Sequence, residues 1–205
     1  RCYFEPDAAL RLSEFNPEDG AFLKAKKEFI VPNGIADHAV GFRPKPPSTT
    51  TGKSPCRILY VGALKETKGL MVLIEACGLL KERGLDFTLR AVGEFESAAF
   101  QEAVAAKVSQ YKLEDMVMFP GILTAEAKFQ QYAEADIFCY PTYFESETFG
   151  IVLLEAMQFS LPVVATRWRG VSWVSWGGRP CCRSWGVLLA RRCSRRIWRT
   201  GRSSM

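Results

Sequence analysis

The sequence predicts an α/β domain built on a parallel sheet that helices cover on both faces. From residue 56 onward, short apolar runs alternate with longer stretches in which apolar residues recur at helical spacing. This alternation indicates right-handed crossovers between parallel strands, and the first run, CRILYVG, has the apolar character of a buried strand. Ligands of such sheets bind where the carboxyl ends of the strands meet the starts of helices.

The predicted elements follow one another regularly. A strand at residues 56–62 leads into a helix from Lys68 to Arg83, which Gly84 ends. Four more strands are predicted at residues 87–92, 116–119, 137–140 and 162–166. Helices over residues 98–111 and 125–135, and a helix that begins near Phe149, separate these strands. The order of strand and helix makes the domain Rossmann-like.

The residues before this domain have a different character. Residues 1–28 are mixed and acidic, with a turn at 16–20, and a short apolar strand at 29–31 stops at Pro32-Asn33-Gly34. Residues 41–55 are rich in Pro, Ser and Thr, as is typical of a linker. Within them, Gly52-Lys53-Ser54 imitates the end of a phosphate-binding loop, but Pro47 stands where that loop needs glycine, so we discard this interpretation.

The residues after the domain differ again, because charge is divided unequally along the chain. All 22 acidic residues lie at or before Glu155, together with 17 of the 27 basic ones. Residues 156–205 hold ten Arg, all five Trp and three Cys, with no Lys and no acid. We interpret residues 171–205 as an anomalous, irregular basic tail and infer a shifted reading frame. The alternative is a basic aromatic arm for nucleic acid or an anionic membrane, which the lack of a clear helical or strand period disfavours.

Composition argues against other classes of protein. No apolar run approaches the roughly 18 residues of a membrane span, and no signal peptide is recognisable, so we expect a cytoplasmic protein. The seven cysteines include no CxxC pair and His38 is the single histidine, so we expect no metal site. Cys56, Cys77 and Cys139 are expected to be buried thiols.

The stretch YPTYFESETFGIVLLEA, residues 140–156, combines two carboxylates with a helix start. Glu147 lies just before the expected start of the helix. Gly150 lets a ligand approach the backbone, and the N–H groups from Phe149 to Ile151 are unpaired donors that attract phosphate. Glu155, eight positions after Glu147, can face the same cleft. In the alternative interpretation Glu147 only caps the helix dipole and Glu155 lies on a solvated face.

Three loops are expected at one edge of the predicted sheet, at residues 62–69, 93–95 and 141–150. The first begins at Gly62 and carries Lys65 and Lys68. A lysine ammonium is a point charge that suits phosphate, so we predict that Lys68 binds it. For Lys65 we prefer the interpretation of a solvated loop lysine, with a phosphate contact as the alternative.

Taken together, these residues resemble a known family. The element ESETFGIVLLEA, followed by LPVVAT, is similar to the Glu-x7-Glu signature of the retaining glycosyltransferases of family 4, which have the GT-B fold. The segments FIVPNGI, VGALKETKG, VGE and FPGIL occur in the order that the family has them, over roughly residues 29–170. The Glu-x7-Glu spacing alone would be a weak signal, whereas the combination is specific.

The resemblance implies roles for individual residues. Glu147 would contact the transferred sugar and Lys68 the diphosphate, so these two would carry catalysis. Glu155 would bond the ribose hydroxyls. The remaining predicted contacts with the donor are Phe149, Gly150 and Ile151 for diphosphate and sugar, Gly121, Ile122 and Leu123 for the base, and Gly62 and Lys65 in the lysine loop.

The resemblance also implies a division of the chain. Residues 1–40 would be a remnant of an N-terminal acceptor domain, 41–55 the linker, 56–170 the nucleotide-sugar-binding half of the GT-B fold, and 171–205 the tail. The sequence departs from the family at Ala63, where an arginine for the diphosphate is usual, and Lys65 is a candidate to compensate. His38 lies beyond the end of the acceptor domain and receives no catalytic role.

The implied function is that of an enzyme, a glycosyltransferase. It would transfer a sugar from a nucleotide-diphosphate sugar to an unidentified acceptor hydroxyl with retained configuration. No metal or other cofactor and no nucleic acid is expected, and peripheral membrane association of the intact enzyme is compatible with the resemblance. The alternative is a non-catalytic nucleotide-binding remnant or interaction module. A Rossmann oxidoreductase is disfavoured, because no GxGxxG follows any predicted strand.

Overall fold

A computed structural model describes residues 5–13, 24–42, 54–176 and 187–190. Its main body is a six-stranded sheet in the order β5-β4-β3-β6-β7-β8, in which every neighbouring pair is parallel. The strands are β3 Cys56–Val61, β4 Phe87–Val92, β5 Val117–Gly121, β6 Ile137–Tyr140, β7 Val163–Thr166 and β8 Val187–Ala190. The five strands that the sequence predicts are confirmed.

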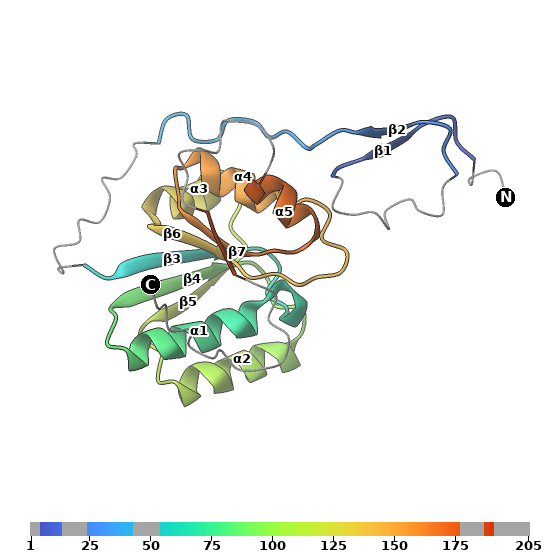
Figure 1. Cartoon of the computed structure of the whole chain (residues 1–205). Coiled ribbons are helices and arrows are strands. Elements are labelled where there is room, and N and C mark those ends of the chain that lie inside the picture. The colour runs from blue at the N-terminus through green and yellow to red at the C-terminus, as the bar shows by residue number, and fades with distance from the viewer. Residues whose placement is uncertain (1–4, 14–23, 43–53, 177–186, 191–205) are drawn as a thin grey trace, which may run out of the picture.

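Helices cover both faces of this sheet (Figure 1). The first face carries α1 Leu70–Glu82 and α2 Ala98–Gln110, and the second carries α3 Ala125–Glu134, α4 Ile151–Gln158 and α5 Arg169–Trp176. A 3-10 turn, η1 Glu66–Lys68, precedes α1. The strand β3 is buried on both faces because these two helix layers sandwich it, and its Leu59 and Tyr60 are almost fully covered. The predicted α/β class is therefore confirmed.

The direction in which strands are added reverses between β3 and β6. From β3 the chain runs through α1, β4 and α2 to the edge strand β5, and then returns over α3 to pair β6 with the other side of β3. At the amino-terminal end of this junction, the Asp136 carboxylate accepts bonds of 2.9–3.1 Å from the backbone N–H and the guanidinium of Arg57. At the opposite end, a doubly wound sheet binds its ligand.

A second, smaller sheet lies to one side of the main body (Figure 1). It pairs β1 Ala9–Arg11 in parallel with β2 Glu28–Ile30. The strand β2 confirms the apolar strand predicted from the sequence, one residue earlier than expected, whereas β1 lies in a stretch that was described only as mixed and acidic. Apolar side chains of this sheet, such as Leu10 and Phe29, are exposed.

The segment after β2 packs against the helices α3 and α4. The Gln158 side-chain amide accepts a bond of 3.1 Å from the His38 backbone N–H and donates one of 2.6 Å to the Ala36 carbonyl. The His38 ring stacks on the Phe129 ring, with centroids 4.1 Å apart. These contacts tie residues 36–38 to the main body across 91 to 122 positions of sequence.

The description of the tail as irregular needs a correction. The helix α5 Arg169–Trp176 and the strand β8 Val187–Ala190 are regular elements, and β8 extends the sheet by pairing with β7. The reason is local: the run VLLA is apolar enough to join a buried parallel sheet, although arginine and tryptophan surround it. Residues 177–186 and 191–205 lie outside the described residues, so the shifted frame and the basic arm stay predictions.

Two other predictions fall mainly outside the described residues. These are the turn at 16–20 and most of the linker, including Gly52 and Lys53. The division of the chain into an acceptor-domain remnant, a linker, a binding domain and a tail stays a prediction. In the part of the chain that the structure describes, no helix is long and apolar enough to cross a membrane.

Candidate functional site

The three loops predicted at one edge of the sheet do come together there. The Leu64 N–H donates to the Glu94 carbonyl at 2.8 Å, which joins the loop after β3 to the loop after β4. The Tyr143 N–H donates to the Thr67 carbonyl at 2.8 Å, which joins the loop after β3 to the loop after β6. The prediction of one shared edge is confirmed.

Two glycines allow the loops to approach so closely. At Gly69, which has a φ of 83°, a Cβ atom would lie 2.1 Å from the Pro141 carbonyl oxygen. At Gly93, which has a φ of 149°, a Cβ atom would lie 1.9 Å from the Gly62 carbonyl oxygen. Both the positive φ and the lack of space require glycine at these positions.

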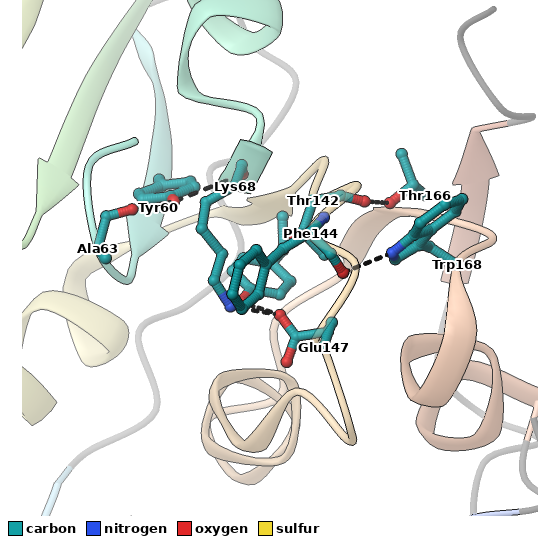
Figure 2. Close-up of polar contacts among 9 residues, drawn as sticks. Tyr60, Ala63, Lys68, Thr142, Phe144, Glu147, Thr166 and Trp168 are labelled. Atoms are coloured by element: carbon teal, nitrogen blue, oxygen red, sulfur yellow. Dashed lines mark hydrogen bonds and ion pairs between the residues drawn. The ribbon is translucent and has the colours of Figure 1, made fainter. Parts of the chain in front are cut away.

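The first group of functional side chains joins the loops on either side of the strand reversal (Figure 2). Lys68 Nζ lies 2.6 Å from Glu147 Oε2 and donates to the Tyr140 hydroxyl at 3.1 Å. The same hydroxyl donates to Glu147 Oε2 at 2.7 Å. We call Glu147, Lys68 and Tyr140 the Glu147 cluster. The Glu147 side chain is 9% exposed and that of Lys68 16%, so the ion pair is largely removed from water.

The aromatic ring of Phe144 lies beside this cluster (Figure 2). The ammonium of Lys65 is 4.0 Å from the ring centroid and that of Lys68 is 4.7 Å from it, so both lysines make cation–π contacts with one ring. Lys65, for which a solvated position was the preferred interpretation, is half-buried. The loop brings the two lysines to the same place.

Side chains from the end of β7 support the loop that carries Glu147. The Trp168 indole N–H donates to the Phe144 carbonyl at 2.7 Å, and the Thr166 hydroxyl donates to the Thr142 carbonyl (Figure 2). The buried Thr142 and these two bonds fix the backbone just ahead of Glu147. The site therefore depends on β7 as well as on β3 and β6.

Tyr60 lies beside the cluster. Its hydroxyl donates to the Ala63 carbonyl at 2.9 Å, and its ring centroid is 6.0 Å from that of Tyr140 (Figure 2). Burial, and then the negative charge of Glu147, raise the pKa of Tyr60 and of Tyr140 above the ordinary value of 10.0. Both hydroxyls are therefore protonated donors at neutral pH. Gly62 faces the same rings, since a Cβ there would lie 3.5 Å from each tyrosine.

The second group surrounds Glu155. Lys128 Nζ lies 2.7 Å from Glu155 Oε1, and the Tyr132 hydroxyl donates to Oε2 at 2.8 Å. We call these three residues the Glu155 cluster. The Glu155 side chain is 9% exposed, so the interpretation that it lies on a solvated face is wrong. Lys128 and Tyr132 are four positions apart on α3 and share one face of that helix.

Aromatic packing holds Tyr132 in place. Its ring stacks on the rings of Phe129 and Phe159, with centroids 6.5 Å and 5.7 Å away, and lies 5.6 Å from that of Phe138. Burial, and then the charge of Glu155, raise the pKa of Tyr132 above its ordinary value. Tyr132 is therefore also a fixed, protonated donor.

The helix that follows Glu147 begins later than predicted. Its N-cap is Gly150, with a φ of 81° and a ψ of 58°, and the first helical residue is Ile151 rather than Thr148 or Phe149. Phe149 is 3% exposed and belongs to the core, and the left-handed backbone of Gly150 keeps the residues before it out of the helix. The unpaired N–H groups of the first turn therefore start at Ile151 rather than at Phe149.

A pocket of about 530 Å³ lies at the carboxyl ends of β4 and β5. Its lining includes Gly121 and Ile122, two of the three residues predicted to contact a base, together with Phe95, Phe119, Glu94 and Gln101. The third, Leu123, is half-buried and does not line it. The apolar rings and polar side chains suit a flat, polar ligand group.

Metal ligands and reactive thiols do not gather at this site. Among the described residues no three His, Cys, Asp or Glu side chains come together, and the expectation that no metal is needed stays a prediction. Cys77 is buried, as expected, whereas Cys56 and Cys139 are half-buried. Burial raises the pKa of the Cys77 thiol to about 12, so it is inert at neutral pH.

Three functional side chains were not foreseen: Tyr140, Lys128 and Tyr132. Each donates a bond to one of the two predicted carboxylates. The spacing of four between Lys128 and Tyr132 indicates a shared helix face, but nothing in the sequence indicates that this face meets Glu155 on α4. Tyr140 was read only as the last residue of an apolar strand.

The fold and the position of the site define a class of protein. It is a doubly wound α/β domain that presents cations, carboxylates and a helix start where its strand order reverses. The chain belongs to the family "Glycosyl transferases group 1", which matches residues 43–174.

Curated relatives agree with this family. A putative colanic acid biosynthesis glycosyltransferase, WcaL, of Escherichia coli (strain K12) is 34% identical over 63% of this chain and 32% of its own length. A D-inositol 3-phosphate glycosyltransferase of Pseudarthrobacter chlorophenolicus is 34% identical over 60% of this chain and 29% of its own. The chain thus spans about a third of the length of these relatives.

Solved structures show the same fold. HepE of Anabaena, in complex with UDP and glucose, has a TM-score of 0.64 at 20% identity and is matched over 80% of this chain and 45% of its own. Sucrose-phosphate synthase of Thermosynechococcus elongatus has a TM-score of 0.65 at 24% identity, over 82% of this chain and 42% of its own. The sheet and its helices therefore match GT-B glycosyltransferase structures.

Proposed function

We propose that this chain binds the nucleotide-diphosphate sugar of a retaining family 4 glycosyltransferase. The observation that carries the proposal is the Glu147 cluster, in which Lys68 and Glu147 lie 2.6 Å apart across the strand reversal, the place where doubly wound sheets bind ligands. The whole enzyme would transfer the sugar to an acceptor hydroxyl with retained configuration.

The diphosphate would lie between Lys68 and the start of α4. The ammonium of Lys68 is close to the loop that leads into the helix, and the first turn of α4 offers unpaired N–H groups beyond Gly150. Lys65, 4.0 Å from the Phe144 centroid, adds a second positive charge two positions after Ala63, where the family usually has an arginine. Such preorganised donors stabilise the charge that develops on a leaving diphosphate.

The sugar and the nucleoside would extend to either side of the diphosphate. Glu147 would accept hydrogen bonds from the sugar, and Glu155 from the ribose. Each oxygen of Glu155 accepts one bond, from Lys128 or from Tyr132. A carboxylate oxygen can accept a second bond, so Glu155 can also accept from the ribose hydroxyls. The base would enter the pocket beside Gly121 and Ile122, and Glu94 there would favour a base edge that carries N–H donors.

The complex of HepE with UDP and glucose supports this arrangement by analogy of fold alone. The acceptor, a cytoplasmic location, peripheral membrane association and independence of metal and of nucleic acid remain part of the proposal. In the alternative, this chain is a nucleotide-binding module without activity of its own. Turnover of a donor sugar by the 205-residue chain would exclude that alternative.

Calorimetric titration with UDP-glucose, GDP-mannose and ADP-glucose tests the proposal. We expect saturable binding of at least one donor, and a loss of about 10- to 100-fold in affinity for Glu155→Gln, because a hydrogen bond to a charged acceptor contributes about 1.5–3 kcal/mol. Glu134→Gln is the matched control, since Glu134 pairs with Arg90 away from the site. Absence of binding to all three donors would overturn the proposal.

A further inference from the structure

We infer that Tyr140 is a positioning residue that holds Glu147 in place when Lys68 turns to the diphosphate. This inference rests on the proposed function and adds a residue that the predicted site lacked. Its basis is the closed triangle of bonds in the Glu147 cluster, in which Lys68 donates to Tyr140 and both donate to Glu147 Oε2.

The ammonium group of Lys68 has two competing anionic partners, Glu147 and the diphosphate of a bound donor. In the structure it neutralises Glu147 at 2.6 Å. With a donor bound, two phosphate groups compete for the same charge, and an ammonium on a flexible stem follows the larger negative charge. The bond from Lys68 to Glu147 is then weakened at the moment when Glu147 must contact the sugar.

Tyr140 is not subject to this competition. Its hydroxyl has a single proton. A lysine ammonium can only donate a hydrogen bond and an ionised carboxylate can only accept one, so the hydroxyl must accept from Lys68 and donate to Glu147. If Lys68 moves away, the hydroxyl keeps its bond of 2.7 Å to Glu147. The donor on the carboxylate is therefore retained.

The ring of Tyr140 is fixed by the strand that carries it. The residue ends β6, is 3% exposed, and its ring lies 6.0 Å from that of Tyr60 and 6.3 Å from that of Phe138. A tyrosine has only two side-chain torsions, and here packing restrains both. Tyr140 is thus a rigid donor, whereas Lys68 is a mobile one.

The test separates sugar contacts from nucleotide contacts. Each chain is titrated with UDP and UDP-glucose, GDP and GDP-mannose, and ADP and ADP-glucose, and the ratio of the two dissociation constants within a pair gives the gain due to the sugar. For Tyr140→Phe we expect this gain to fall about tenfold, because a bond to a charged carboxylate is lost, while the affinity for the nucleoside diphosphate stays within about twofold.

Tyr132→Phe is the matched variant. It removes the same hydroxyl from the other carboxylate, Glu155, which we assign to the ribose, so it should weaken both members of a pair and leave their ratio unchanged. Thermal melting of both variants shows that they fold.

Three results would overturn the inference. The first is an unchanged sugar gain in Tyr140→Phe, and the second is an equal loss for diphosphate and donor, which would mean that Tyr140 acts on the whole loop. The third is a wild-type chain that binds the diphosphate and the donor equally. A wild-type chain that binds neither overturns the proposed function, and this inference with it.

Discussion

The Glu147 and Glu155 clusters contain the same kinds of side chain but are built differently. Each buried glutamate receives one bond from a lysine and one from a tyrosine. In the Glu147 cluster both donors meet on a single oxygen, and they come from the turn η1 and from the end of the strand β6. In the Glu155 cluster the donors take one oxygen each and come from one face of α3.

This difference teaches which cluster can rearrange. Lys128 and Tyr132 are held at a fixed spacing by helix geometry, so the Glu155 cluster is a rigid platform. The Glu147 cluster depends on loop contacts made close by glycine and supported from β7. The part of the site that we assign to the reacting sugar is thus formed by side chains from separate elements, whereas the part assigned to the ribose has both donors on one helix.

Removal of the lysines should give the largest effects. Lys68→Met removes the cation that lies 2.6 Å from the buried Glu147 and should lower the free energy of unfolding by about 3 kcal/mol. Lys128→Met should cost less, about 2 kcal/mol, because the Lys128 side chain is 23% exposed against 16% for Lys68. Urea denaturation measures both losses.

The exposed lysine Lys26 provides the control for this comparison. Its side chain is 71% exposed and pairs with Asp7, so Lys26→Met should change the free energy of unfolding by less than about 0.5 kcal/mol. Equal losses in all three variants would show that burial of the two clusters has no energetic weight.

A methyl group at Gly170 should disturb one cluster and not the other. A Cβ there would lie 1.9 Å from the Thr148 carbonyl oxygen and 2.8 Å from Phe149 Cα, both of them backbone atoms that cannot easily move. Gly170→Ala should therefore lower the free energy of unfolding by about 2 kcal/mol and displace the loop that carries Glu147. Calorimetry should show a larger loss of affinity for the donor than for the diphosphate, because the displaced loop carries Glu147 as well as the start of α4.

Gly34→Ala is the matched substitution, because a Cβ at Gly34 meets no atom within 4 Å. It should leave both stability and binding as they are. If Gly170→Ala weakened the binding of the nucleoside diphosphate as strongly as that of the donor, the two clusters would not be structurally separate.

Alkaline pH should produce the smallest effect and act on both clusters. Folding raises the pKa of Tyr132 and of Tyr140 above 10.0, so their contribution to stability is fully present below pH 10 and is lost as the pH rises above it. At pH 10.5 the lost contribution of each tyrosine should lower the free energy of unfolding by roughly 0.8 kcal/mol. Urea denaturation at pH 8.0 to 10.5 measures the slope.

Substitution by phenylalanine removes the titrating group. Tyr132→Phe and Tyr140→Phe should each flatten the pH dependence by about the same amount. A slope that neither buried substitution alters would show that other groups govern alkaline unfolding.

The sheet and the first carboxylate could be predicted because their signals are local in sequence. Apolar runs at fixed spacing specify parallel strands, and the carboxyl ends of such strands share an edge, which brings Lys68 and Glu147 together. The helix start was misplaced because Gly150 adopts a positive φ that sequence alone does not reveal. The strand β8 was missed because its neighbours in sequence obscure its pattern.

The donors to the carboxylates could not be predicted, for a physical reason. Lys128 and Tyr132 meet Glu155 only because α3 and α4 lie side by side on the same face of the sheet. Tyr140 had the pattern of a core residue, and its ring is indeed buried, but its hydroxyl reaches a carboxylate seven positions later. Side-chain partners between elements depend on packing that no single segment encodes.

The amide of Gln158 has a consequence for how the chain moves. By bonding both the Ala36 carbonyl and the His38 N–H, it fixes residues 36–38 to α4. Any pivoting of β1 and β2 relative to the main sheet must therefore be taken up before Ala36. The irregular segment at residues 32–34 lies just upstream, and a Cβ at Gly34 would meet no atom within 4 Å. Gln158 therefore sets the downstream limit of any such pivot.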